Sequence, residues 1–82
     1  MVREKQEPMA SRWKDYITSD PKILRGKPRL KGTRIPASLV LGYLAAGKTP
    51  EQVIAEFPDL MLEQIAACLD YARDLAEFGV AV

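Results

Sequence analysis

Proline and glycine divide the first half of this chain into pieces that are too short for a helix. Three prolines and two glycines lie between residues 21 and 36. Proline removes a backbone donor inside a helix and glycine loses more backbone entropy than other residues, so a helix here would lose several kcal/mol. We therefore expect residues 22–35 to form a β-hairpin or an extended arm. A short strand near 14–18 precedes it and ends at the turn signal of residues 19–21, SDP.

In the second half of the chain, the prolines and glycines lie mainly at the expected ends of helices. A first helix is expected after Pro36, in the run ASLVLGYLAA, whose apolar side chains point nearly all round, and Gly47 is a good C-terminal stop. Residues 49–52, TPEQ, combine an N-cap threonine, a proline at the first helical position and a glutamine three residues after the cap. This is the pattern of a capping box and predicts a second helix over about 50–57.

A third helix is expected over about 61–77, after the break at residues 58–59, PD. Its inward positions should recur at alternating steps of three and four residues. These positions are Leu62, Ile65, Leu69, Ala72 and Ala76.

The fold class that follows is α+β, mainly α. A short N-terminal β-hairpin should be followed by a three-helix, helix-turn-helix-like bundle. We expect one domain over 11–82, in which 11–35 is a β or extended basic segment and 36–79 holds the helices. Residues 1–10 are polar and lack periodicity, which predicts a flexible tail.

Charge is distributed unevenly along the chain, although the net charge is only +1. Residues 1–34 carry ten Lys and Arg against four Asp and Glu, whereas residues 35–82 carry two against seven. A basic half favours an anionic partner such as nucleic acid. An acidic half disfavours one, and either repels DNA or attracts a basic protein.

The residue types present in the chain restrict the kinds of catalytic and metal site that it can form. The chain contains no histidine and one cysteine, Cys68. A His-based acid/base or triad mechanism is excluded, and a transition-metal site would have to use Cys68 and carboxylates alone. A single cysteine cannot form an internal disulfide, and we expect Cys68 to be an inert core residue. With no signal peptide or long apolar segment, we expect a cytoplasmic protein without a membrane span or a cofactor, and the enzyme class is disfavoured.

The segment RGKPRLKGTRIP, residues 25–36, holds five cations and no acid. It lacks the G-x-x-x-x-G-K-[ST] spacing of a phosphate loop. Alternate cations would line one face of an extended strand and could follow a nucleic-acid backbone. The nucleic-acid-binding residues predicted in this way are Arg25, Lys27, Arg29 and Lys31. The competing interpretation is a solvated basic hairpin whose glycines and prolines only shape turns.

Other residues of the segment are expected to shape or anchor it. The predicted structural anchors are Gly26, Pro28, Gly32 and Arg34. The guanidinium of Arg34 is expected to pair with a carboxylate or a helix-end carbonyl, because this residue lies where the chain enters a buried helix.

The third helix is a poor candidate for reading the DNA major groove. Its outer positions are acidic, and acids opposite phosphates are repelled. A competing interpretation is dimerisation or partner docking along the first and third helices. The residues predicted for such contacts are Leu41, Tyr43, Leu44 and Tyr71. Trp13 and Tyr16 either stack on bases or, as is more common, cover a small core.

From Asp15 to about Tyr71 the chain resembles the bacterial and archaeal family called domain of unknown function 433. The motifs that carry the resemblance are YITSDP at 16–21, GKP at 26–28, KGTRIP at 31–36, Leu44 with Gly47, Pro50 with Glu51, Phe57 with Pro58, Ala67 to Leu69, and Tyr71 with Ala72. The resemblance implies an N-terminal hairpin and a helix-turn-helix-like trihelical part. It also implies a VapB-type antitoxin role beside a PIN-like ribonuclease toxin.

Two departures from the family pattern bear on this chain. The family usually has threonine at the position of Met61, where it would cap the third helix, and Asp59 is expected to take that role here or leave the helix start weaker by about 1 kcal/mol. The family also usually has glycine and an apolar residue at the positions of Arg25 and Arg29. These two arginines add charge to the hairpin.

The function expected from these features is that of an antitoxin-like component of a type II toxin–antitoxin module. It would bind and neutralise the PIN-like ribonuclease as a homodimer, and would bind operator DNA to regulate its own transcription. The alternative is a protein-interaction or dimerisation module that does not bind DNA, in which the basic segment enters an acidic cleft of the nuclease.

Overall fold

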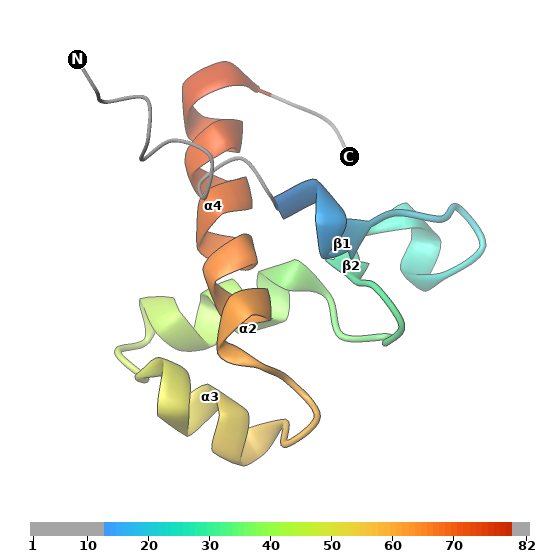
Figure 1. Ribbon diagram of the computed structural model, residues 1–82. Coiled ribbons are helices and arrows are strands. Elements are labelled where there is room, and N and C mark those ends of the chain that lie inside the picture. Colours follow the sequence, from blue (N-terminus) through green and yellow to red (C-terminus); the bar gives the residue numbers. More distant parts are fainter. Residues whose placement is uncertain (1–12, 80–82) are drawn as a thin grey trace.

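A two-stranded ribbon and three helices make up residues 13–79, the part of the chain that this computed structural model describes (Figure 1). The order is η2 (Trp13–Asp15), β1 (Ile17–Thr18), η3 (Leu24–Gly26), β2 (Arg29–Leu30), α2 (Ala37–Ala45), α3 (Pro50–Glu56) and α4 (Leu62–Phe78). The fold is α+β, mainly α, as predicted. The tail predicted for 1–10 lies outside the described residues. None of the described helices is long and apolar enough to cross a membrane.

The ribbon pairs β1 with β2 in antiparallel register, with Ile17 opposite Leu30. The strand is shorter than the predicted 14–18, because residues 13–15 turn as a 3-10 helix in which the Tyr16 N–H donates to the Trp13 carbonyl at 2.9 Å. This turn directs Trp13 inward, where only 2% of its surface remains exposed. The predicted aromatic cover of the core is thus confirmed for Trp13.

Helix α2 begins where the ribbon ends. The Ala37 N–H donates to the Pro28 carbonyl at 2.9 Å, which joins the first turn of α2 to the segment before β2. The helix ends at Ala45, two residues before the predicted stop at Gly47, whose φ of 94° allows the Gly47 and Lys48 N–H groups to bond the Leu44 and Tyr43 carbonyls. This pair of bonds is a Schellman motif, and it turns the chain into α3.

Helix α3 starts with the predicted capping box. The Thr49 hydroxyl accepts from the Gln52 N–H at 3.1 Å, and the Gln52 side chain accepts from the Thr49 N–H at 2.8 Å. At the other end of α3, Phe57 stacks on Tyr43 of α2 with ring centroids 5.7 Å apart. Local hydrogen bonds therefore fix where α3 begins, and an aromatic contact fixes how it packs on α2.

Most of the elements contribute side chains to one core. Its largest fully buried side chains are Trp13, Leu30, Val40, Val53, Ile65 and Cys68. Because η2, β2, α2, α3 and α4 all contribute, no single pair of elements forms a core without the others. At about 25 cal/mol per Å² of apolar surface, burial of this kind is the main stabilising contribution in so small a domain.

Helix α4 turns a different face to the core from the one predicted. Ile65 is buried, but Leu62 and Leu69 are 53% and 49% exposed and Ala76 is exposed. The side chains that α4 buries are Ile65, Ala67, Cys68 and Tyr71. Steps of three (65 to 68 to 71) and four (67 to 71) residues connect these side chains, so they also have helical spacing, and the aromatic contact between Trp13 and Tyr71 decides which stripe faces inward.

The start of α4 is only half capped. The Gln64 side chain accepts from the Met61 N–H at 2.7 Å, as in a capping box, but the Met61 side chain has no oxygen, and the Gln64 N–H donates to the Met61 backbone carbonyl at 3.0 Å instead. Asp59 does not take the capping role predicted for it, since Met61 is the N-cap residue. Met61 already has the extended backbone of a cap, with φ −116° and ψ 161°, and its side chain is 53% exposed.

Met61→Thr should therefore stabilise the chain by less than about 1 kcal/mol, because the new hydroxyl gives the Gln64 N–H a second acceptor beside the backbone carbonyl, on a backbone that needs no change. The urea midpoint of unfolding measures the gain. Met61→Ala removes the same side chain without supplying an acceptor and serves as the control. If the threonine and alanine variants unfold at the same urea concentration, the missing acceptor is not what limits the helix start.

Candidate functional site

The loop between β1 and β2 holds a left-handed turn. Leu24, Arg25 and Gly26 have φ values of 53°, 57° and 81°. The turn is closed by the Gly26 N–H donating to Ile23 at 3.0 Å and the Lys27 N–H donating to Leu24 at 3.1 Å. Glycine adopts this backbone without strain, whereas a leucine or an arginine there costs roughly 1–2 kcal/mol. The turn thus holds the exposed Arg25 side chain on a strained backbone.

A second turn, after β2, is organised by Thr33. Its hydroxyl donates to the Leu30 carbonyl at 2.8 Å and accepts from the Ile35 N–H at 3.0 Å. Gly32, with φ 79°, makes this turn possible without strain. Thr33 was not among the predicted site residues, although a threonine directly after a glycine in a loop is a signal for such side-chain to backbone bonds.

Arg29 was predicted to face nucleic acid and Arg34 to anchor the segment, but the fold holds Arg29 and exposes Arg34. Arg29 is half-buried, its Nη1 donates to the Thr33 carbonyl at 3.1 Å, and its buried Nε has no hydrogen-bond partner among the described residues. Arg34 is exposed, and within residues 13–79 no carboxylate or helix-end carbonyl pairs with it. The anchor predicted at Arg34 is therefore wrong, and Arg29 takes that place because its side chain folds back over the second turn.

The remaining cations lie in two loops, 21–28 and 31–35, which we call the basic loops. Their exposed cations are Lys22, Arg25, Lys27, Lys31 and Arg34. The two loops flank the short ribbon, and in Figure 1 both project from the side of the molecule away from α4. The predicted alternation along one strand face is not present, because β2 spans only Arg29–Leu30. The structure therefore separates Arg25, Lys27 and Lys31 from Arg29.

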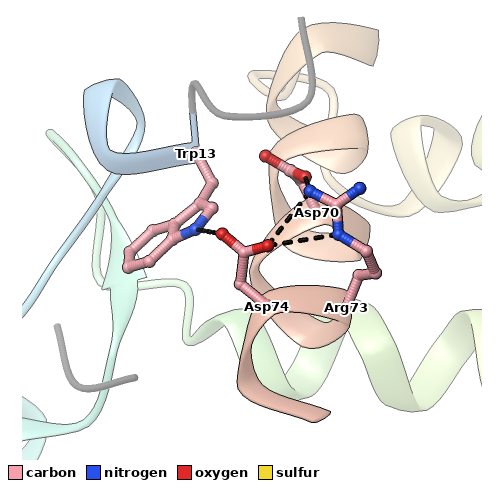
Figure 2. A network of polar contacts seen from close by, with 4 residues as sticks. All are labelled: Trp13, Asp70, Arg73 and Asp74. Atoms are coloured by element: carbon pink, nitrogen blue, oxygen red, sulfur yellow. Dashed lines mark hydrogen bonds and ion pairs between the residues drawn. The ribbon is translucent and has the colours of Figure 1, made fainter. Parts of the chain in front are cut away.

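On the opposite side of the ribbon, Trp13 joins a polar network on α4 (Figure 2). The indole Nε1–H of Trp13 donates to Asp74 at 2.8 Å. Arg73 bonds the other oxygen of Asp74 at 3.0 Å and reaches Asp70 at 2.6 Å. The Trp13 ring also meets Tyr71 edge-on, with centroids 4.8 Å apart. The network thus holds the N-terminal turn η2 against the middle of α4.

The two carboxyls of this network are shifted in opposite directions. The hydrogen bond from Trp13 holds the pKa of Asp74 below its ordinary 3.8, with Arg73 acting in the same direction. Burial raises the pKa of Asp70 above 3.8, although Arg73 opposes that rise. Folding therefore favours the charged form of Asp74 and the neutral form of Asp70.

Asp74→Asn should consequently destabilise the chain more than Asp70→Asn at pH 7. The stabilisation from ionised Asp74 is present above pH 3.8 and is lost as the pH falls through its lowered folded pKa. The ionisation of Asp70 affects stability with the opposite sign, because its raised pKa means that its charge opposes folding at neutral pH. Urea midpoints at pH 7 and near pH 3 measure the effect. A difference between the two variants that is the same at both pH values would contradict this assignment.

Arg25→Gly should stabilise the chain by up to about 1 kcal/mol, because glycine removes the strain of the left-handed backbone. The control is Lys27→Gly, which removes a neighbouring exposed cation at an ordinary φ of −65° and should destabilise instead. Thermal unfolding of the two variants at equal ionic strength separates strain from charge. Similar shifts in both would show that charge removal, not strain, governs stability here.

The residues predicted for partner contacts lie mostly inside the fold. Tyr71 is 9% exposed and packs on Trp13, so its ring presents no surface to a partner. Leu41, Tyr43 and Leu44 are half-buried against the core. Apolar surface is exposed elsewhere, on α4 at Leu62, Leu69, Leu75 and Phe78 and on α2 at Leu39.

Within residues 13–79, Cys68 is not set up as a reactive thiol and the acidic side chains are not grouped as a metal site. Burial raises the pKa of the Cys68 thiol to about 12, so the thiol remains protonated at neutral pH. In that part of the chain no three His, Cys, Asp or Glu side chains are grouped to hold a metal ion.

Residues 17–72 match the family described as protein of unknown function (DUF433), which is well over half of the sequence. The chain belongs to the DUF433 family. The matched part contains the ribbon, both basic loops, α2, α3 and most of α4. Trp13, Arg73 and Asp74 lie outside the DUF433 match, so the polar network on α4 is only partly a family feature.

The DUF433 chain is 37% identical over 60 residues to "Uncharacterized protein y4eO" of Sinorhizobium fredii (strain NBRC 101917 / NGR234). The alignment covers 73% of this chain and 27% of that protein. The chain thus spans about a quarter of the length of this curated relative. No solved structure matches the chain.

Proposed function

We propose that this DUF433 chain is the antitoxin-like component of a bacterial toxin–antitoxin pair. It binds and neutralises a PIN-like ribonuclease and contacts operator DNA through the basic loops. The observation that carries the proposal is the spatial separation of two binding features. The exposed cations lie in the basic loops, whereas the exposed leucines and most exposed acids lie on the helices.

The basic loops supply the DNA-binding part of the proposal. Their five exposed cations make no ion pair within residues 13–79, and the loops contain no acid. Lys and Arg in this state release condensed counterions when they meet phosphates, which gives affinity without base reading. The presence of Arg25 on a strained backbone supports a role for its charge, since strain of this kind is common at binding sites.

Helix α4 is a weak candidate for the DNA contact. In a helix-turn-helix the N-terminal residues of the later helix contact the base edges. Here those residues are Met61, Leu62 and Glu63, two exposed apolar side chains and an acid. Arg73 is already bonded to Asp70 and Asp74. The proposal therefore places α4 on the protein partner and the basic loops on DNA.

The homodimer and the cytoplasmic location remain part of this proposal. A two-fold arrangement would present two sets of basic loops to a palindromic operator. The half-buried side chains Leu41, Tyr43 and Leu44 are the contacts predicted for α2 in such a dimer. A reducing cytoplasm suits the single buried thiol of Cys68.

The DNA part is tested by salt dependence on the chain's own upstream DNA. Replacing Arg25, Lys27 and Lys31 together by alanine should weaken binding and lower the slope of log K against log salt by about 0.9 for each phosphate that is no longer neutralised. Lys48→Ala removes an exposed cation outside the basic loops and should leave affinity and slope nearly unchanged. An unaltered slope in the triple variant would remove the basic loops from the proposal.

The protein part is tested by mixing the chain with the product of the neighbouring gene and measuring RNA cleavage. Inhibition together with a shift of upstream DNA supports the full proposal. Inhibition without any DNA shift favours the alternative, in which the basic loops enter an acidic cleft of the nuclease. That alternative also predicts that the triple alanine variant loses inhibition, whereas the full proposal predicts that it keeps inhibition.

A further inference from the structure

The second basic loop, the one that follows β2, is held at both ends by hydrogen bonds. The Leu30 N–H donates to the Ile35 carbonyl at 3.0 Å, and the Ile35 N–H donates to the Thr33 hydroxyl at 3.0 Å. The Lys31 N–H donates to the Tyr16 carbonyl at 2.8 Å, which fixes the start of the loop on the ribbon. The ends of this loop are therefore ordered without a ligand.

The guanidinium of Arg29 reaches into this loop from β2. Its Nη1 donates to the Thr33 carbonyl at 3.1 Å, while the Thr33 hydroxyl donates to the Leu30 carbonyl at 2.8 Å. Within residues 13–79 the Thr33 carbonyl accepts no other hydrogen bond. Arg29 therefore joins the middle of the loop to the ribbon.

The surroundings of Arg29 keep it from acting as an ordinary phosphate contact. Its Nε is buried without a hydrogen-bond partner, and no carboxylate pairs with it within residues 13–79. Arginine binds phosphate best through two parallel N–H groups, but here Nη1 is bonded to the loop and Nε is covered. A half-buried cation with an unbonded donor costs free energy. That cost is accounted for if the side chain orders a binding loop.

We propose that Arg29 is a positioning residue for DNA binding, which orders the second basic loop so that Lys31 and Arg34 meet phosphates. Arg29 makes no phosphate contact itself. An ordered loop loses less conformational entropy when it binds, so Arg29 raises the affinity without adding to the charge that binding neutralises. The inference rests on the proposed DNA contact of the basic loops, and it names the residue that prepares this contact.

The experiment uses the full chain and measures loop order and DNA binding separately. Loop order is the exchange rate of the Thr33 and Ile35 amide protons in the free chain, measured by nuclear magnetic resonance. The amide protons of Gly26 and Lys27, which are bonded within the first basic loop, serve as the internal reference. DNA binding is the affinity for the chain's own upstream duplex, together with its salt slope.

Arg29→Met keeps the aliphatic stem and removes the guanidinium. We expect the Thr33 and Ile35 amide protons to exchange about tenfold faster and the DNA affinity to fall about tenfold, the size expected for one hydrogen bond from a charged donor. The salt slope should not change, because no phosphate contact is lost. Arg34→Met is the matched change at an exposed arginine. It should lower the slope by about 0.9 and leave the exchange rates unchanged.

Arg29→Lys keeps the charge, and it decides the question if Arg29→Met fails to fold by circular dichroism. Lysine ends in a compact ammonium on a shorter side chain, so it lacks the planar fork that reaches the Thr33 carbonyl. Faster exchange at Thr33 and Ile35, weaker binding and an unchanged salt slope are again expected.

Three results would overturn the proposal. Exchange rates equal to those of the unchanged chain would mean that Arg29 does not order the loop. A salt slope that falls as far in Arg29→Met as in Arg34→Met would make Arg29 a phosphate contact. Full affinity in Arg29→Lys would mean that its charge alone is needed. If the unchanged chain does not bind upstream DNA, the proposed function fails, and the exchange rates still decide whether Arg29 orders the loop.

Discussion

The contact between Trp13 and α4 is the interaction on which the rest of the structure depends. It joins residues 61 positions apart, through the indole hydrogen bond to Asp74 and the edge contact with Tyr71. A ribbon of two-residue strands is not stable in water by itself. By packing Trp13 against α4, the chain gains a core that includes the ribbon residue Leu30. The positions of both basic loops follow from this docking, because they flank the ribbon.

The same contact determines which surfaces remain available for binding. With Trp13 and Tyr71 inside, the buried face of α4 is fixed, and Leu62 and Leu69 are left exposed. In the network with Trp13, the side chains of Asp70 and Asp74 are largely buried, so they add little to the acidic surface. Both carboxylates also bond Arg73. The cations of the basic loops and the exposed leucines of α4 thus lie on different surfaces. This separation supports the proposal that the chain binds two partners.

Local signals explain which parts of the fold could be predicted. Gly47 and the box of Thr49 and Gln52 act within a few residues of each other, and the helices end and begin where these signals lie. The roles of the arginines in the basic segment were harder to predict, because they depend on the direction in which each side chain points. Arg29 folds back onto Thr33 while Arg34 points to solvent, and both have similar neighbours in the sequence.

The sequence by itself determined the three helices, the hairpin class and the uneven charge, because backbone restrictions, caps and composition are local properties. It also placed the chain in its family. Only the tertiary structure decided which stripe of α4 is buried, since both stripes have helical spacing and the choice depends on a tryptophan far away in the chain. It likewise decided that Arg29 is held and Arg34 exposed, because burial is a property of the folded neighbours rather than of the residue.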